Sequence, residues 1–408
     1  MDRQWTVAQI GAREHYAVPR LLHRRDQLHR LYTDAWCRAG RSFLQKMPEP
    51  LCSFANRFHD GVPSRKVRSY TRRAIYHRLR YHLSRPNSGV ARFQHYMDVG
   101  ADFASRVRDD LRARIDDWHH RAFFGYDTGS LEVLEYLAGT SCVTVVDQMD
   151  PGRVHREIMI QESEDWPGWA KHEPRIYEPY EKRRETEWNL SSLVVVNSEW
   201  SKKALMEQGV PAKKISVISL AYEPPSVSPS FRSSEDASLN VLWLGSVNLT
   251  KGIQYLMQAA RLLQEESIRF DVVGPLEITD EAVQSSPGDM CFWGGVPRDQ
   301  TSKFYQDADV FVLPTLSDGF AITQLEAMAH GCPVITTPNC GRVVTPEEDG
   351  LLVPSRDAEA LAKALLRCAQ DREMIATMSR KAQRTAQRFT LDAYADRLLS
   401  VVEDQISA

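Results

Sequence analysis

Short apolar runs alternate with longer amphipathic stretches along most of the chain. The runs at residues 142–146 (CVTVV) and 193–198 (LVVVNS) have the length and the β-branched content of buried strands. Residues 131–138 and 199–209 carry helical periodicity beside them. Further strands are expected at residues 7–11 and 215–220. This alternation predicts a parallel sheet that is covered by helices on both faces.

The pattern breaks at residues 223–239 (EPPSVSPSFRSSEDASL), which contain three prolines and six serines and show no periodicity. We interpret this stretch as a linker. The alternation then restarts. Strands are expected at residues 240–245, 269–274, 290–295, 309–314 and 333–337, and helices at 252–264, 301–308, 321–330 and 357–370.

The sequence therefore predicts an α/β protein of two doubly wound, Rossmann-like domains that face each other across a central cleft. The first domain is expected to span residues 1–222 and the second residues 240–386, with the linker 223–239 between them. An amphipathic helix is expected at residues 389–406. In sheets of this kind, ligands bind beyond the carboxyl ends of the strands.

Composition and charge add a second feature, which is an uneven distribution of basic residues. The 408 residues are 42% hydrophobic and 26% charged, which is typical of a globular protein. The net charge is −3, yet residues 1–125 hold 24 Lys and Arg against 12 Asp and Glu, whereas the remainder holds 27 against 42. A basic first third favours an anionic partner in that part of the chain.

The densest basic stretch is residues 65–82 (RKVRSYTRRAIYHRLRYH), which we expect to be helical. Such a helix could lie on anionic lipid headgroups. It could also cradle a phosphorylated acceptor. The third interpretation is a solvated helix that forms ion pairs with acidic neighbours such as Asp109, Asp110, Asp116 and Asp117.

Other features bear on location and on metal binding. No apolar run approaches the roughly 20 residues that span a bilayer, and the first residues, MDRQWTVAQIGARE, lack the apolar core of a signal peptide. The seven cysteines are scattered singly, which predicts a cytoplasmic protein without a disulfide framework or a zinc site. Four histidines, His155, His172, His119 and His120, show no metal-ligand spacing, so we interpret them as structural.

The most informative segment is residues 314–337 (PTLSDGFAITQLEAMAHGCPVITT). A strand is expected to end just before it, and a helix is expected to run to His330 and to stop at Gly331. The loop between them holds Asp318 and Gly319. Because Gly319 has no side chain, the backbone there can approach a ligand closely.

The start of this helix carries chemistry suited to an anionic ligand. Its first backbone N–H groups, together with the helix dipole, favour an anion such as a diphosphate. These groups belong to Phe320, Ala321 and Ile322. Two carboxylates, Asp318 and Glu326, flank them and suit sugar hydroxyls, so the segment favours a sugar nucleotide. The alternative is a surface loop in which Asp318 only caps the helix.

These residues resemble the E-x7-E signature of family-4 retaining glycosyltransferases, which have the GT-B fold. The usual form is Glu-Gly-Phe-Gly, then Leu-Glu-Ala-Met-Ala, then Gly-x-Pro-Val-Ile. The matching blocks are Asp318-Gly319-Phe320-Ala321, Leu325-Glu326-Ala327-Met328-Ala329, Gly331-Cys332-Pro333-Val334-Ile335 and residues 348–354 (EDGLLVP). Upstream blocks are Leu244-Gly245-Ser246 with Lys251-Gly252, Asp271-Val272-Val273-Gly274, and residues 309–314. The resemblance is strong over residues 240–355, moderate over 193–222 and weak before that, where only the strand pattern and the Gly11 turn agree.

The resemblance implies a transferase that moves a sugar from a nucleoside-diphosphate sugar to a hydroxyl of a glycan or glycolipid, as in polysaccharide biosynthesis. Glu326 would bind the ribose, Asp318 would contact the donor sugar, and Lys251 would stabilise charge on the departing diphosphate. The donor site would be completed by Gly11, Gly245, Ser246, Gly295, Val296, Gly319, Phe320, Ala321 and Ile322. No metal or other cofactor is implied, since the chain lacks an Asp-x-Asp motif. In this fold the segment 387–408 returns to the first domain.

Three positions depart from the family pattern. Asp318 replaces a Glu and is one methylene shorter, and Ser246 replaces an Arg that clamps the diphosphate. Arg13 and Arg342 are candidates for the missing charge. The His that many members place by the sugar is not evident, and Asp147 lies in the loop expected there. We therefore expect Arg13 and Asp147 on the acceptor side.

The expected mechanism is front-face displacement, in which the acceptor hydroxyl attacks from the side of the leaving diphosphate. Protein groups would then supply orientation and charge stabilisation. Two alternatives stay open: a non-catalytic protein that binds sugar nucleotides or glycans, and a sugar-nucleotide epimerase. Release of nucleoside diphosphate upon addition of acceptor distinguishes them. We expect the protein in the cytoplasm, peripherally at the inner face of the membrane through residues 65–82, and without a nucleic-acid partner.

Overall fold

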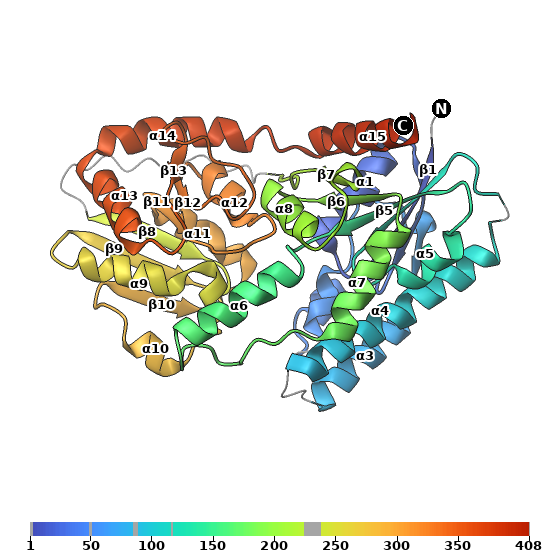
Figure 1. Ribbon diagram of the computed structural model, residues 1–408, viewed down its shortest axis with the longest axis horizontal. Coiled ribbons are helices and arrows are strands. Elements are labelled where there is room, and N and C mark those ends of the chain that lie inside the picture. The colour runs from blue at the N-terminus through green and yellow to red at the C-terminus, as the bar shows by residue number, and fades with distance from the viewer. Residues whose placement is uncertain (1–2, 49–50, 85–88, 116, 224–237, 408) are drawn as a thin grey trace.

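The chain folds into two α/β lobes that lie side by side (Figure 1). The computed structural model describes residues 3–48, 51–84, 89–115, 117–223 and 238–407. The expected linker, residues 223–239, falls almost entirely outside these described ranges. Asp116, one of the expected ion-pair partners of the basic stretch, also lies outside them.

The first lobe is built on a seven-stranded parallel sheet in the order β3-β2-β1-β4-β5-β6-β7. Its strands are β1 (Gln4–Gln9), β2 (Leu28–Thr33), β3 (Val67–Ser69), β4 (Arg121–Tyr126), β5 (Val143–Gln148), β6 (Leu193–Val196) and β7 (Ile215–Val217). The three central strands β1, β4 and β5 are buried along nearly their whole length, because helices cover both faces of the sheet.

The second lobe repeats this plan with six parallel strands in the order β10-β9-β8-β11-β12-β13. They are β8 (Leu239–Leu244), β9 (Ile268–Val273), β10 (Met290–Gly294), β11 (Val310–Leu313), β12 (Val334–Thr336) and β13 (Gly350–Leu352). In each sheet the order reverses beside the first strand of the lobe, which is the position where doubly wound sheets open a crevice for ligands. The prediction of two doubly wound α/β domains is confirmed.

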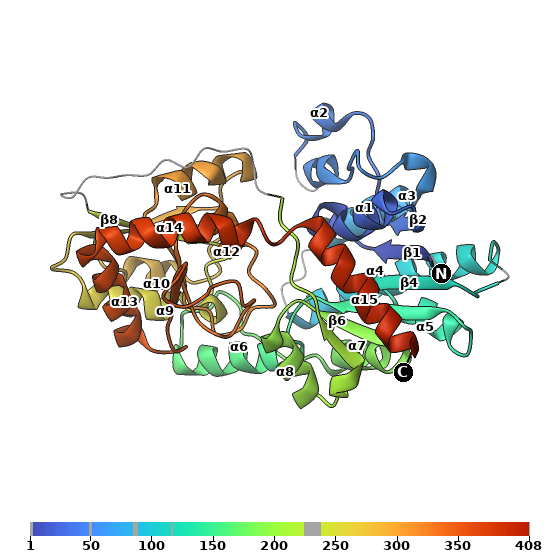
Figure 2. The same cartoon turned by 90° about the horizontal axis from the view of Figure 1, so that it is seen from above.

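Helices cover both faces of each sheet (Figures 1 and 2). In the first lobe they are α1 (Ala17–Arg24), α2 (Arg41–Leu44), α3 (Thr71–Ser84), α4 (Gly89–Arg112), α5 (Leu131–Leu137), α6 (Arg153–Asp165), α7 (Glu178–Leu190) and α8 (Glu199–Glu207). Those that follow are α9 (Ile253–Leu262), α10 (Asp280–Gln284), α11 (Thr301–Asp307), α12 (Thr323–Ala329), α13 (Ala358–Gln370), α14 (Arg372–Ala386) and α15 (Leu391–Ser407).

The last helix leaves the second lobe and packs on the first (Figure 2). Tyr394, Leu398 and Val402 of α15 are buried in the same hydrophobic cluster as Trp5 of β1 and Leu21 of α1. At about 25 cal/mol per Å² of apolar surface, burial of such side chains stabilises the contact by roughly 1.5–3 kcal/mol each. The first lobe thus takes part of its core from the end of the chain.

Helix α6 makes the opposite crossing, from the first lobe to the second (Figure 1). The carboxylate of Glu162 is fully buried and accepts hydrogen bonds from Gln254 at 2.7 Å and Tyr255 at 3.1 Å, both on α9. Arg356 Nε lies 2.6 Å from its other oxygen. Residues 169–171 then pair with residues 277–279 of the second lobe, through the N–H of Lys171 to the carbonyl of Glu277 at 3.1 Å, among others.

The basic stretch 65–82 is not one continuous helix, which corrects the expectation. Its first part forms β3 at the edge of the first sheet, paired with β2, and α3 starts only at Thr71. The strand forms because Val67–Ser69 can complete the sheet edge. Arg68 lies 3.6 Å from Asp110, one of the expected acidic partners. Arg73 lies 3.1 Å from Asp102, a partner that the sequence did not suggest.

None of the helices in the described part of the chain combines the length and the hydrophobicity needed to cross a lipid bilayer.

Candidate active site

Lys251 and Asp318 lie at the carboxyl edge of the second sheet, where β8 and β11 are neighbours. Lys251 ends a 3₁₀ turn that Asn248 caps, since its Oδ1 accepts the backbone N–H of Lys251 at 3.0 Å. The carbonyl of Thr250 accepts the N–H of Leu316 at 2.8 Å, which fastens this turn to the loop after β11. The two loops therefore hold Lys251 and Asp318 side by side.

The side chains of Lys251 and Asp318 form an ion pair through Nζ and Oδ2. They are 23% and 13% exposed, so the pair is largely withdrawn from water. Burial lowers the pKa of Lys251 to about 8. Contact with the Asp318 carboxylate acts in the other direction, so Lys251 is a cation at neutral pH.

The second oxygen of Asp318 occupies the backbone donors that were expected for the diphosphate. Its Oδ1 accepts the N–H of Phe320 at 3.2 Å and of Ala321 at 3.1 Å. Helix α12 begins at Thr323, two residues later than expected, because Ala321 turns the chain with a left-handed φ of 58°. The expectation of unsatisfied donors at Phe320 and Ala321 is therefore wrong for this conformation, and a diphosphate reaches them only if Asp318 releases them.

Glu326 is also engaged, on the first turn of α12. Tyr305 donates its hydroxyl hydrogen to Oε2 at 2.9 Å, and Arg298 Nη2 lies 3.3 Å from Oε1. The carboxylate is 15% exposed, whereas the Arg298 side chain is 67% exposed. Each oxygen retains a second lone pair, so Glu326 can still accept hydrogen bonds from the hydroxyls of a ribose.

The backbone at Gly319 packs against residues of the first lobe and does not face an open cleft. A Cβ at this position would lie 2.1 Å from the carbonyl oxygen of Met149 and 2.9 Å from the amide of Asn197. Both residues belong to loops that follow strands of the first sheet. The expected close approach of the backbone at Gly319 exists, but the partner is protein.

The same loop contacts the first lobe through Ser317. Its Oγ accepts a hydrogen bond from Trp200 Nε1 at 3.2 Å and shares one with His155 Nδ1 at 3.0 Å. Burial lowers the pKa of His155 to about 4, so the imidazole is neutral at physiological pH. The sequence suggested a structural role for His155, and the structure places it beside the loop that holds Asp318.

The remaining expected donor-site residues line the same edge of the second sheet. Gly245 directly follows β8 and donates its N–H to the carbonyl of Val273 at 2.9 Å, and the half-buried Ser246 comes next. Gly295 and Val296 come directly after β10 and precede Arg298. Arg342, one candidate for the missing phosphate clamp, is exposed.

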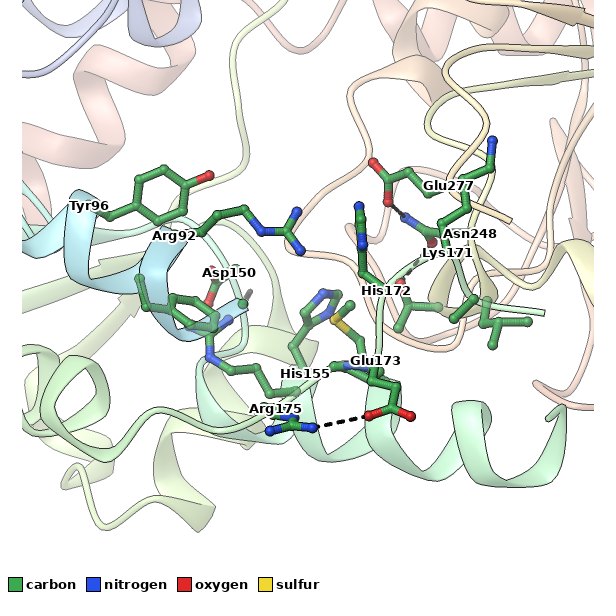
Figure 3. A pocket seen from close by; sticks show the side chains of 18 of the residues that line it. Arg92, Tyr96, Asp150, His155, Lys171, His172, Glu173, Arg175, Asn248 and Glu277 are labelled. Atoms are coloured by element: carbon green, nitrogen blue, oxygen red, sulfur yellow. Dashed lines mark hydrogen bonds and ion pairs between the residues drawn. The ribbon is translucent and has the colours of Figure 1, made fainter. Parts of the chain in front are cut away.

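One cavity lies between the two lobes, and a second lies within the first lobe. The interdomain cavity has a volume of about 460 Å³ (Figure 3). Its wall includes Arg92, Tyr96, Asp150, His155, Arg156, His172, Asn248, Thr250 and Glu277. The first-lobe cavity, of about 360 Å³, opens at the carboxyl ends of β1 and β4 and is lined among others by Ile10, Arg13, Arg57, Arg78, Tyr126 and Asp150. Both cavities share Tyr96 and Asp150.

Of the two expected acceptor-side residues, Arg13 lies at a cavity and Asp147 does not. Arg13 lines the first-lobe cavity, and the turn at Gly11 lies beside it, with the Gly11 N–H donated to Asp34 at 2.9 Å. Asp147 does not line either cavity. It is 2% exposed because β5 continues to Gln148, two residues beyond the expected strand end.

Burial and the neighbouring Glu14 raise the pKa of Asp147 well above its ordinary value. The acceptor-side expectation for Asp147 is therefore corrected, and Asp150 lines the cavities in its place. Burial would raise the pKa of Asp150, but Arg184 and Arg156 outweigh it and hold that pKa below its ordinary value.

Four site residues were not found from the sequence: Asp150, His155, Arg298 and Tyr305. Asp150 follows a predicted strand, and Arg298 lies two residues after Val296. The sequence therefore indicated these two residues only through their position just after a strand end. His155 and Tyr305 gave no such indication, because both lie on helices. Within the described residues, no three His, Cys, Asp or Glu side chains are grouped as metal ligands. That the site works without a metal stays a prediction.

Comparison with known proteins finds a family match in the second lobe. The family described as Glycosyl transferases group 1 matches residues 238–371. The amylovoran biosynthesis glycosyltransferase AmsK of Erwinia amylovora is 26% identical over 266 residues, which cover 62% of this chain and 60% of that protein. The D-inositol 3-phosphate glycosyltransferase of Saccharomonospora viridis is 38% identical over 106 residues, 26% of this chain and 25% of that protein. The chain thus spans at most about three-fifths of these curated relatives.

Solved structures share the fold over nearly the whole chain. Sucrose-phosphate synthase from Thermosynechococcus elongatus superposes with a TM-score of 0.64 at 16% identity, covering 99% of both chains. HepE of Anabaena, solved in complex with UDP, gives 0.60 at 16% identity over 98% of this chain and 100% of that one. These likenesses confirm the predicted two-domain fold class.

Proposed function

We infer, from a chain whose residues 238–371 form a glycosyl transferases group 1 domain, that this protein is a glycosyltransferase of polysaccharide biosynthesis. The proposed reaction moves a sugar from a nucleoside-diphosphate sugar to a hydroxyl of a glycan or glycolipid, with retention of configuration and without a metal. The observation that carries the proposal is the largely buried contact of Lys251 with Asp318, eight residues before Glu326, at the carboxyl edge of the second sheet.

Each of these residues has a role in the proposed reaction. Lys251 is a cation where negative charge grows on the departing phosphate, so it stabilises the transition state more than the ground state. Glu326 accepts hydrogen bonds from the ribose hydroxyls and fixes the nucleotide. Asp318 orients the donor sugar once the diphosphate takes over Lys251 and the N–H groups of Phe320 and Ala321.

The proposed course is front-face displacement, without a covalent intermediate on the protein. In the proposed step the acceptor oxygen forms its bond to the anomeric carbon as the bond to the diphosphate breaks. The proton of the acceptor hydroxyl passes to the departing phosphate oxygen, so no protein base is required.

A thermal-shift panel with UDP, GDP, ADP and their sugars tests donor binding. One nucleotide is expected to raise the melting temperature, since a ligand that binds the native state stabilises it by mass action. Glu326→Ala should abolish that shift. Glu359→Ala, an exposed carboxylate on α13, is the matched control and should retain it. No shift with any nucleotide would contradict the proposal.

A specific observation favours a second candidate, a non-catalytic protein that binds sugar nucleotides or glycans. Ser246 removes one guanidinium from the expected phosphate site, and the two carboxylates are engaged by Lys251 and Arg298. Chromatographic detection of nucleoside diphosphate upon addition of an acceptor glycan decides between the two. Nucleotide binding without such release would favour the second candidate.

We also propose that α3 rests on an anionic membrane surface. The exposed fractions of Tyr76, Leu79 and Leu83 are 49%, 40% and 81%, and arginines lie among them along the helix. Apolar side chains with interspersed arginines suit the headgroup region of a bilayer. Leu83→Asp should lower co-sedimentation with anionic vesicles. Leu262→Asp, at a leucine that is 60% exposed on α9, should not; equal binding to neutral vesicles would contradict the proposal.

A further inference from the structure

The first-lobe cavity has a wall of arginines that the proposed donor site does not use. Arg13 follows β1, Arg57 follows the 3₁₀ turn Cys52–Asn56, and Arg78 lies on α3. Three segments that are far apart in the chain each bring a guanidinium group to one cavity of about 360 Å³. Guanidinium groups that line one cavity attract an anionic ligand to it.

The acidic residues in this wall are already engaged. Arg184, which is fully buried and does not line the cavity, lies 2.7 Å from Asp150 and 3.7 Å from Asp127. Burial raises the pKa of Asp127 above its ordinary value. Asp34 accepts the N–H of Gly11 at 2.9 Å and lies 3.7 Å from Arg57. Counting Arg184 with the three arginines of the wall gives four guanidinium groups against the three carboxylates Asp34, Asp127 and Asp150, an excess of one positive charge.

Arg57 is held in place by the turn at Gly11. The φ of Gly11 is 91°, and a Cβ there would lie 2.6 Å from Arg57 Nη1, so the guanidinium lies directly on the backbone of the turn. The side chain of Arg57 is 22% exposed. Arg13, two residues after Gly11, has its guanidinium carbon 5.8 Å from the centre of the Tyr126 ring. Both arginines are thus positioned before any ligand binds.

Aromatic side chains complete the wall, namely Phe54, Tyr96, Tyr126 and Tyr180. Aromatic faces pack against the apolar faces of sugar rings. The fork of an arginine matches the two oxygens of a carboxylate or phosphate. Together they suit a sugar that carries an oxyanion.

We propose that the first-lobe cavity is an acceptor subsite that binds an anionic group, a phosphate or a carboxylate, attached to the acceptor glycan. The inference rests on the proposed transferase function and specifies its acceptor. Because the two cavities share Tyr96 and Asp150, an acceptor anchored there extends into the interdomain cavity (Figure 3). The far wall of that cavity is Asn248–Thr250, directly before Lys251.

The anionic group has two chemical sources, which calorimetric titration distinguishes. The probes are n-octyl diphosphate, which represents the diphosphate of a lipid carrier, and methyl β-D-glucuronide, which represents an acidic sugar. Methyl β-D-glucoside is the neutral control. Each probe is titrated into the protein alone and with the donor site filled by the nucleoside diphosphate found in the thermal-shift panel.

One anionic probe is expected to bind at least tenfold more tightly than the neutral glycoside. Arg13→Gln and Arg57→Gln should each weaken it about tenfold, which is typical for the loss of a hydrogen bond to a charged group. Arg72→Gln is the matched control, because Arg72 is an exposed arginine of α3 that lines neither cavity. Tighter binding of the diphosphate supports a lipid-linked acceptor, and tighter binding of the glucuronide supports an acidic glycan.

The inference is overturned if neither anionic probe binds more tightly than the glucoside, or if Arg72→Gln weakens binding as much as Arg13→Gln. It is also overturned if Lys251→Ala abolishes binding to the nucleotide-free protein while Arg13→Gln leaves it unchanged, since the probe then occupies the donor site. Failure of the proposed function is seen separately, because no nucleotide would then raise the melting temperature in the thermal-shift panel. The titrations into the protein alone still test the cavity in that case.

Discussion

Ala321 adopts a backbone conformation that suits glycine better than alanine. Its φ is 58°, in the left-handed region where Cβ crowds the following carbonyl at a cost of roughly 1–2 kcal/mol. The turn keeps its shape because Asp318 accepts the N–H of Ala321 at 3.1 Å. The family pattern that this segment resembles has glycine here. The alanine therefore stores strain beside the carboxylate that is proposed to orient the donor sugar.

Ala321→Gly is expected to stabilise the protein by about 1 kcal/mol, because it removes the Cβ that opposes the left-handed turn. For a protein of this size the melting temperature should rise by about 1–3 °C in calorimetry. Ala329→Gly, in the last turn of α12, is the control and should lower it, since glycine costs roughly 0.5–1 kcal/mol in a helix. A lowering by both variants would contradict the argument.

Lys251 gives nucleotide binding a dependence on pH. Its pKa is lowered to about 8, so the cation that faces the diphosphate is present below pH 8 and is lost as the pH rises through that value. The dissociation constant of the nucleotide should therefore rise about tenfold per pH unit above pH 8. Titration calorimetry between pH 6.5 and 9.5 measures this. Lys251→Arg should flatten the profile whatever its affinity, because arginine stays protonated; an unchanged slope would exclude Lys251 as the titrating group.

At the scale of elements, continuous apolar runs were the most informative signal. Residues 240–245 and 309–314 were expected as strands and form β8 and β11, because both are buried on two faces and need no alternation. Strand β2 was not expected, since its sequence, LHRLYT, includes polar residues that interrupt the apolar run. The edge strand β3 was not expected either, because it lies within residues 65–82, whose basic residues suggested a helix.

The carboxylate of Glu162 ties α6 to the second lobe, alongside the contact of His155 with Ser317, so removal of Glu162 tests its share of that tie. Glu162→Ala is expected to cost about 2–4 kcal/mol, because it leaves one N–H of buried Gln254 and the Tyr255 hydroxyl without their acceptor and removes the ion-pair partner of Arg356. The melting temperature should fall by at least about 4 °C. Glu164→Ala, an exposed carboxylate of the same helix, should have little effect. Equal melting temperatures for the two variants would show that Glu162 contributes nothing to the tie.

At the scale of the whole molecule, the loop that holds Asp318 also joins the lobes. Ser317 contacts His155 and Trp200, and Gly319 lies against the carbonyl of Met149. The site loops themselves were predictable, because their motifs are local in sequence. The contacts across the cleft were not, since His155 and Ser317 are 162 residues apart and only the folded chain brings them together.

Gly319→Ala is expected to open the cleft, because its Cβ would lie 2.1 Å from the Met149 oxygen. The backbone must move apart, and misplacement of Asp318 should lower the transfer rate about 10–100-fold. Small-angle X-ray scattering should give a larger radius of gyration with an unchanged circular dichroism spectrum. Gly288→Ala is the control, since nothing lies within 4 Å of a Cβ there. A compact, fully active Gly319→Ala protein would contradict the close packing.

The reciprocal crossings of α6 and α15 govern how this scaffold can be recombined. A chimera that joins the first lobe of one relative to the second lobe of another at the linker would separate α15 from Trp5 and Leu21, and Glu162 from Gln254. Grafting a new acceptor specificity therefore requires two junctions, one at the linker and one before α15, together with matched residues on α6. The donor of the first lobe must also supply α15, and the contact residues of α6 must match the recipient's α9. Exchange at a single breakpoint would leave α15 packed against a first lobe from another relative, and α6 against an α9 from another relative, so neither contact would match.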